Sequence, residues 1–120
     1  MPATFPGVGY QYLVDFGAFK AALNFTSSTS LTYTVIAADG TPGASKTVVI
    51  RIEELRTDLF LVTWQEADKT TVVHIEDYEN KVIITNITNP AGSFEQFHGT
   101  FTTVMPTRTA GIGTASARSI

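Results

Sequence analysis

The chain has 120 residues, of which 43% are hydrophobic and 16% are charged, and its formal net charge is −3. This length accommodates one domain, and this composition is that of a globular protein rather than a disordered chain. The mild negative charge, without a basic stripe, argues against a nucleic-acid or anionic-membrane partner. The absence of cysteine excludes disulfides, thiol catalysis and cysteine-based metal sites.

Segments rich in β-branched and aromatic residues alternate with turn residues at short intervals, which predicts an all-β protein. We expect eight strands, in chain order near 10–16, 19–27, 30–38, 45–55, 58–66, 70–78, 81–89 and 94–104. Consecutive strands with short connections form an up-and-down meander, and closing that meander removes both of its edges. The sequence therefore predicts an antiparallel eight-stranded barrel of the calycin (lipocalin-like) type, with a β-sandwich as the alternative topology.

The predicted barrel domain takes up residues 1–105, and residues 106–120 form a small, polar, glycine-containing tail. A tail of this composition is typical of flexible segments, and a partner subunit is one candidate for holding it. The N-terminal stretch MPATFPGVGY lacks the basic and apolar regions of a signal peptide, and no segment approaches the length of a membrane span. We expect a cytoplasmic protein and, as the commonest soluble assembly, a homodimer.

The most hydrophobic strand, LFLVTWQE at 59–66, ends in an acid. Side chains alternate along a strand, so Trp64 and Glu66 share one face and enter the barrel together. A hairpin centred on Arg56 places Lys46 opposite Glu66. A register two residues away keeps the same faces and makes Lys46 a diagonal neighbour. In either register an ammonium lies near a carboxylate that would otherwise lack a partner in an apolar interior.

These three side chains allow more than one interpretation. Glu66 is a candidate general acid or base, or a carboxylate at the barrel rim that is paired with Lys46 and partly solvated. Lys46 is a candidate anchor for an anionic ligand, although a lysine at a barrel mouth often extends into solvent. Trp64 has the character of a core residue, one edge of which can line a cavity.

Three tyrosines point inward in the same alternation: Tyr10 and Tyr12 on the first strand, and Tyr33 on the third. A buried tyrosine hydroxyl needs a hydrogen-bonding partner. These tyrosines are therefore candidate ligand contacts, with a satisfied place in the core as the alternative.

The direction of His74 depends on the turn before it. A two-residue turn at 67–68 points His74 outward, whereas a three-residue turn through Lys69 points it inward beside Val62, where it could transfer protons. His98 adds little to this picture. His74 and His98 are far apart in the sequence and lack a third ligand, so they give little support for a metal site. The sequence also contains no phosphate-binding loop, and we expect neither a metal nor a cofactor.

Four segments together, GYQYLVDFG, LTYTV, GASKTV and TWQE, are similar to those of calycin-type barrels. The likeness extends over residues 7–104. The chain resembles the MoaF-like proteins in overall length and strand spacing, and resembles the phenolic acid decarboxylases more distantly. The MoaF-like resemblance implies a lipocalin-like barrel, a group often of undefined activity.

The resemblance to the decarboxylases implies a cavity for a para-hydroxycinnamic acid. It also implies an acting glutamate at Glu66, a tyrosine at Tyr12, a second tyrosine near Val14 and an arginine near Lys46. Two of these four positions differ here, because Val14 has no hydroxyl and Lys46 lacks the bidentate fork of arginine.

The sequence therefore supports three hypotheses. The first is a small-molecule-binding barrel whose ligand is a small apolar or aromatic molecule with an acidic or phenolic end. That ligand would contact Tyr10, Tyr12, Tyr33, Lys46, Trp64, Glu66 and His74. The second is a cofactor-independent lyase in which Glu66 exchanges the proton and Tyr12 holds the substrate. The third is a dimeric structural or interaction module.

Overall fold

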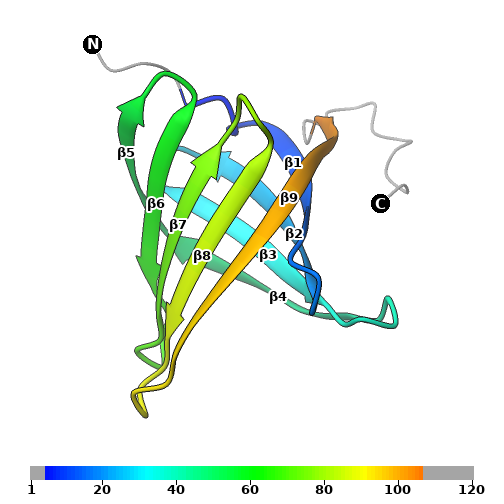
Figure 1. Ribbon diagram of the computed structural model, residues 1–120, viewed down its shortest axis with the longest axis vertical. Coiled ribbons are helices and arrows are strands. Elements are labelled where there is room, and N and C mark those ends of the chain that lie inside the picture. The colour runs from blue at the N-terminus through cyan, green and yellow to red at the C-terminus, as the bar shows by residue number, and fades with distance from the viewer. Residues whose placement is uncertain (1–4, 107–120) are drawn as a thin grey trace.

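The computed structural model describes residues 5–106 and shows an all-β domain built from one antiparallel sheet (Figure 1). Its nine strands are β1 Tyr10–Asp15, β2 Lys20–Ser27, β3 Ser30–Ile36, β4 Pro42–Val49, β5 Arg51–Arg56, β6 Leu59–Gln65, β7 Thr71–Asp77, β8 Val82–Thr88 and β9 Phe94–Pro106. The all-β, antiparallel prediction is confirmed. Residues 107–120, which make up nearly all of the predicted tail, lie outside the described residues. Within the described part, no helix is long and apolar enough to cross a membrane.

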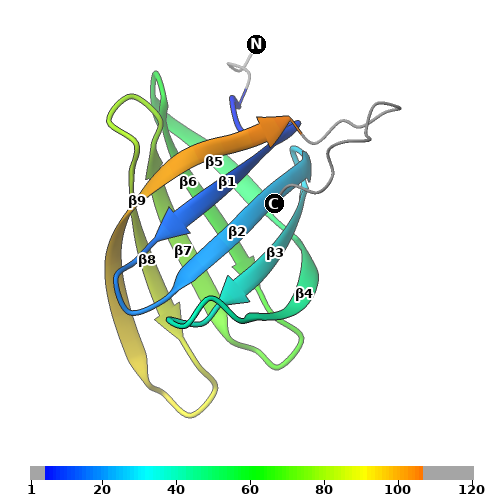
Figure 2. The ribbon, with the colours of Figure 1, turned by 90° about the vertical axis from the view of Figure 1, so that its right-hand side faces the viewer.

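The strands follow the predicted meander. The sheet order is β4-β3-β2-β1-β9-β8-β7-β6-β5, so consecutive strands lie side by side except β4 and β5, and β1 also pairs with the last strand, β9. Figure 2 shows β1 between β2 and β9. Val14 pairs with Ala21 on β2 and with Phe101 on β9, which joins the two ends of the chain into one sheet.

The ninth strand arises because the predicted strand at 45–55 is two strands. The break falls at Ile50, whose side chain is 2% exposed and whose backbone N–H donates to the carbonyl of Thr29 at 3.0 Å. Before the break β4 pairs with β3, and after it β5 pairs with β6. The apolar alternation runs through Ile50 without a glycine or proline, so the sequence carries no sign of this change of partner.

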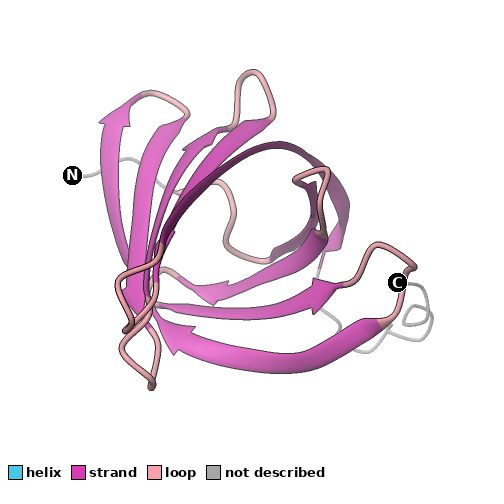
Figure 3. Ribbon diagram, turned by 60° about the horizontal axis from the view of Figure 1, so that its bottom comes forward, coloured by secondary structure: helices cyan, strands magenta, loops and turns pink. Residues whose placement is uncertain are grey.

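The expected closure of the barrel is wrong. The sheet curls into a half-barrel whose two edges are β4 and β5, and in the described residues no hydrogen-bonded ladder joins β4 to β6 (Figure 3). Its two edges are consecutive in the chain and meet at Ile50. The opening therefore lies beside the bend, where the chain turns away from β3 to reach β6.

The β5–β6 hairpin adopts the alternative register, two residues away from the one centred on Arg56. Ile52 pairs with Val62, so the same faces point inward as predicted. The hairpin turns at Asp58, which has a φ of 63°. Aspartate tolerates this left-handed conformation better than most residues, and the centre of the hairpin lies one residue further along the chain than predicted.

One end of the barrel is filled by an aromatic cluster. Its members, which are all buried, are Phe5, Tyr12, Phe25, Phe60, Tyr78 and Phe101. Phe5 packs edge-on against Phe25 and Phe60, with ring centroids 5.0 Å apart in both pairs. Gly7 passes so close that a Cβ there would lie 2.7 Å from the Phe5 ring. The segment before β1 therefore closes this end, and space remains only toward the other.

Candidate functional site

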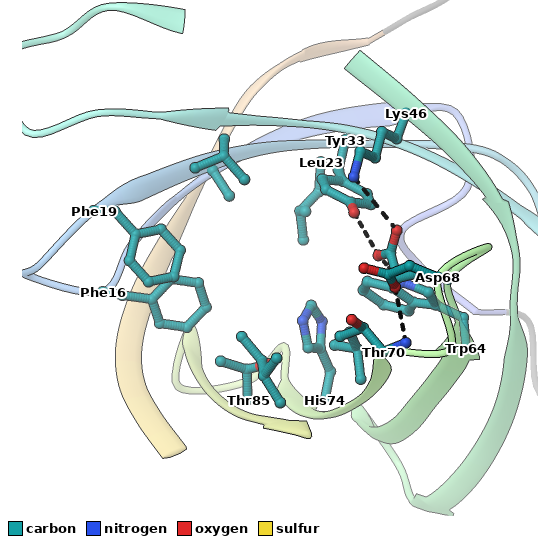
Figure 4. Close-up of a pocket in the computed structure, with 15 residues that line it drawn as sticks. Phe16, Phe19, Leu23, Tyr33, Lys46, Trp64, Asp68, Thr70, His74 and Thr85 are labelled. Carbon is teal, nitrogen blue, oxygen red and sulfur yellow. Dashed lines mark hydrogen bonds and ion pairs between the residues drawn. The ribbon is translucent and has the colours of Figure 1, made fainter. Parts of the chain in front are cut away.

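The open end of the barrel contains a cavity of about 210 Å³ (Figure 4). Its apolar walls are formed by Phe16, Phe19, Ala21, Leu23, Val35, Trp64, Val72 and Ile87. Its polar lining consists of Tyr33, Lys46, Glu66, Asp68, Thr70, His74 and Thr85. These residues come from β2, β3, β4, β6, β7 and β8 and from the turns after β1 and β6. The barrel is thus hollow at this end and filled by side chains at the other.

Glu66 is the centre of a hydrogen-bonded cluster at the cavity wall. Its Oε2 accepts from the indole N–H of Trp64 at 2.8 Å and also from the hydroxyl of Tyr33. Its Oε1 lies 3.9 Å from the ammonium of Lys46, whose side chain is 62% exposed, against 11% for Glu66. The carboxylate is therefore held by two neutral donors, while Lys46 contributes a solvent-screened charge from the mouth.

Tyr33 is perturbed by this cluster. Its pKa is raised above the usual value for tyrosine, first by burial and then by the hydrogen bond to Glu66. Its ring lies 5.8 Å from that of Trp64, and Trp64 in turn makes an edge-on contact of 4.9 Å with His74. The three rings thus line the cavity as one continuous surface.

The turn after β6 fixes both Glu66 and His74. The N–H of Glu66 donates to Thr70 at 2.7 Å, which encloses a three-residue turn at 67–69, and Lys69 has a φ of 82°. Asp68 stabilises the turn by accepting from the N–H of Thr70 at 2.9 Å. With three residues in the turn, His74 pairs with Val62 and points inward. Of the two turns that the sequence allowed, the three-residue one occurs.

Behind the cavity lies a buried network that sequence reasoning missed. The Nδ1 atom of His74 lies 2.9 Å from Oε2 of Glu76, and the hydroxyl of Tyr78 donates to Oε1 of Glu76 at 2.8 Å. Glu76 is only 1% exposed and His74 only 4%. His74 and Glu76 are every second residue on β7, and Tyr78 directly follows the strand. All three side chains therefore lie on its inner face. Once His74 points inward, the same alternation puts Glu76 and Tyr78 inside as well.

The structure separates Tyr10 and Tyr12 from the cavity. Tyr10 is 41% exposed and is not among the residues that line the cavity. Tyr12 belongs to the aromatic cluster, where burial and, secondly, the charge of Glu76 raise its pKa to about 12. The space between Tyr12, Glu76 and Tyr78 is too narrow for a water molecule, and Tyr12 does not line the cavity. Tyr12 and Glu66 therefore do not share a site in this structure.

The other five predicted ligand contacts line the cavity: Tyr33, Lys46, Trp64, Glu66 and His74. Thr85, which the sequence did not single out, lines it as well. It is 1% exposed, and its hydroxyl has no hydrogen-bonding partner in the described part of the chain. Thr85 pairs with His74 across β7 and β8, so both side chains lie at the same level of the barrel.

Among residues 5–106, no three histidine, aspartate or glutamate side chains are arranged to hold a metal ion. His98 is exposed, and its ring nitrogen lies 3.2 Å from the side-chain oxygen of Gln96. The carboxylate, imidazole and hydroxyl groups that line the cavity can form hydrogen bonds and exchange protons with a bound molecule.

Comparison with known proteins decides the family. A family model described as MoaF-like matches residues 8–102. The chain belongs to the MoaF-like family. This MoaF-like protein is also similar to a solved structure from Burkholderia vietnamiensis, described as a "putative beta-lactamase". The two share 24% sequence identity and a TM-score of 0.77, over 86% of this chain and 100% of the other. This likeness concerns the fold alone. A search of curated proteins found no match.

Proposed function

We propose that this MoaF-like protein binds a small, mainly apolar molecule inside its half-barrel. The observation that carries this proposal is the cavity of about 210 Å³ whose polar groups gather on an otherwise apolar lining. Concave, mostly apolar sites with a few convergent polar groups are typical of ligand sites, but drug-sized ligands occupy about 300–1,000 Å³. An apolar cavity of about 150 Å³ holds a benzene molecule. A ligand with one substituted aromatic ring therefore fits best.

The charges around the cavity favour a phenol over a carboxylic acid at the mouth. Glu66 and Asp68 carry negative charges there, and Lys46 supplies one positive charge. A ligand carboxylate would face two like charges. A phenolic hydroxyl can instead donate to Oε1 of Glu66, since the two protein donors already use Oε2. The sequence predicts a ligand with either an acidic or a phenolic end. We propose the phenolic one.

Trp64 provides a direct reporter of this binding, because it is the single tryptophan of the chain and lines the cavity. We expect 4-ethylphenol to change the tryptophan fluorescence saturably, and to bind more tightly than 4-ethylbenzoate. Glu66→Gln replaces the free carboxylate oxygen and should weaken binding of the phenol. The matched control is Glu79→Gln, since Glu79 is exposed. Absence of a saturable signal with any single-ring probe would refute the proposal.

The lyase alternative has less support from the geometry. It needs Tyr12 beside Glu66, and Tyr12 lies in the aromatic cluster instead. An absorbance spectrum of a para-hydroxycinnamic acid, followed over time with purified protein, distinguishes the two functions. Progressive loss of the band would indicate turnover, whereas an immediate and constant shift would indicate binding alone.

The dimeric module stays a prediction, and the tail at 106–120 is one segment that could take part in such a dimer. Light scattering of the full chain and of a chain that ends at residue 105 tests it. If the shorter chain still formed a dimer, the tail would not be needed for the interface.

A further inference from the structure

We propose that Thr85 and His74 form a second polar subsite in the cavity, which binds a hydroxyl group at the far end of the ligand. This inference rests on the proposed function, because it assumes that the cavity holds a single-ring molecule. It adds a chemical requirement to that function: the ligand carries a hydroxyl at each end, one for Glu66 and one for this subsite.

The first observation is the unpartnered hydroxyl of Thr85. Buried polar atoms in native proteins nearly always have a hydrogen-bonding partner, and an exception calls for an explanation. Thr85 is 1% exposed, lines the cavity, and has no partner for its Oγ1 among the described residues. Valine has nearly the same shape and would fill this position without leaving a polar atom unpaired. The oxygen itself is closed off from the cavity, so a rotation about χ1, which exchanges its hydroxyl and methyl positions, brings the hydroxyl to a ligand group that supplies the missing partner.

The second observation is the fixed orientation of His74. Its Nδ1 is hydrogen-bonded to Glu76, and Tyr78 holds Glu76 from the other side. The opposite ring nitrogen, Nε2, is left for the cavity, and Figure 4 shows the His74 ring and Thr85 beside each other at the cavity lining. A carboxylate behind an imidazole fixes the ring and the position of its proton, as in metal sites and catalytic triads. The network is thus suited to presenting Nε2 to a ligand.

A hydroxyl group is the ligand chemistry that these two residues match. It can donate to one partner and accept from the other, and the Thr85 hydroxyl can do either. When Glu76 is ionised it only accepts, so Nδ1 carries a proton, and in the neutral imidazole Nε2 then accepts from the ligand. A ligand carboxylate would approach the buried Glu76, a like charge. An alkyl group would leave the Thr85 hydroxyl unpaired.

The two polar positions lie on different parts of the sheet. Glu66 follows β6 and is held by Tyr33 from β3, whereas His74 and Thr85 belong to β7 and β8. Figure 4 shows Lys46 and Tyr33 across the cavity from His74 and Thr85. A ring with para substituents presents one polar group to each position, in a cavity that Leu23 and Trp64 also line.

A matched pair of probes tests the subsite: 4-(hydroxymethyl)phenol and 4-ethylphenol, which have the same number of non-hydrogen atoms and differ only in the terminal hydroxyl. Titration of Trp64 fluorescence gives the affinity ratio of the two probes. We expect Thr85→Val to reduce this ratio by up to about tenfold, the factor that corresponds to the net free energy of one hydrogen bond. Thr85→Ser, which keeps the hydroxyl, should preserve the ratio.

The control is Thr88→Val, the same substitution on β8 at a position that does not line the cavity. Thermal unfolding confirms that each variant is folded. An unchanged ratio in folded Thr85→Val, with both probes still bound, would overturn the subsite and leave the proposed function intact. If neither probe bound the wild-type protein, the proposed function would fail and the subsite with it.

Discussion

Trp64 donates its indole N–H to Glu66, two residues further along the same face of the chain, at 2.8 Å. The acid at the end of the most hydrophobic strand thus receives its first partner from that strand itself. The second, Tyr33, comes from β3 across the barrel. Glu66 therefore ties two distant strands together at the cavity, and the ammonium of Lys46, which the sequence suggested as its main partner, is more distant at 3.9 Å.

Removal of this acceptor should destabilise the fold. In Glu66→Ala, the indole of Trp64 and the hydroxyl of Tyr33 both lose their acceptor in a partly buried place. Unsatisfied groups of this kind cost about 1–3 kcal/mol. We expect urea denaturation to show a loss of that size in the free energy of unfolding. Glu79→Ala, which removes an exposed carboxylate, is the control and should change stability by less than about 0.5 kcal/mol. Equal effects in the two variants would contradict the assignment.

Because of the buried network behind the cavity, loss of the hydroxyl group should lower the stability of the protein at Tyr78 but not at Tyr10. Tyr78→Phe removes a donor from the buried carboxylate of Glu76, and a hydrogen bond to a charged group contributes about 1.5–3 kcal/mol. Tyr10→Phe makes the same chemical change at an exposed position and should leave stability nearly unchanged. Chemical denaturation of both variants measures the difference. If Tyr78→Phe were as stable as the wild type, Glu76 would not depend on this donor.

Thr85→Val should make the ligand-free protein more stable. The substitution keeps the shape of the side chain and removes a buried hydroxyl that has no partner in the described residues. We expect the free energy of unfolding to rise by about 1 kcal/mol, with no rise in Thr88→Val. If Thr85→Val were more stable and no longer favoured the probe with the terminal hydroxyl, the unpaired group would serve binding and not stability. A destabilised Thr85→Val variant would show that the hydroxyl has a structural role.

The tyrosine pKa values predict loss of stability at alkaline pH. Burial raises the pKa of Tyr12 to about 12, whereas a tyrosine in the unfolded chain titrates near 10. Below pH 10 the hydroxyl is neutral in both states, and its contribution is fully present. Between pH 10 and 12 the unfolded chain loses the proton first, so stability falls as the pH rises. Burial also raises the pKa values of Tyr33 and Tyr78, which act in the same direction.

Unfolding experiments from pH 8 to pH 12 check this expectation, with phenolate absorbance as the second signal. The fall should be less steep in Tyr12→Phe, because one of the shifted groups is gone. A slope that is the same in this variant and in the wild type would mean that Tyr12 titrates alike in both states.

Much of the fold was predictable because side-chain alternation is a strong and local signal. It gave the strands, the inward direction of Trp64 and Glu66, and the two possible directions of His74. It could not locate the change of partner at Ile50, since the apolar pattern of Val48, Ile50 and Ile52 continues through the bend. Pairing between strands is a non-local property, and this bend has no turn residue to mark it.

The site was harder to predict for the same reason. Glu76 looked like an ordinary polar residue until the length of the turn before β7 was known, because a change of one residue there reverses every side chain of the strand. Thr85 is a common strand residue, and its distinguishing feature, an unpaired hydroxyl, exists only in three dimensions. Tyr10 and Tyr12 were grouped with the ligand contacts because alternation gives the face of a residue and not its height along the barrel.

The division of the barrel into a filled end and a hollow end has a consequence for how such a protein can change. Phe5, Phe25 and Phe60 close one end, while Phe16 and Phe19 bound the cavity at the other, beside the turn after β1. Substitutions among the latter can alter which molecule fits without removing the packing that keeps the chain folded. The same scaffold can therefore acquire new ligand preferences through changes at its open end, while the closed end preserves its fold.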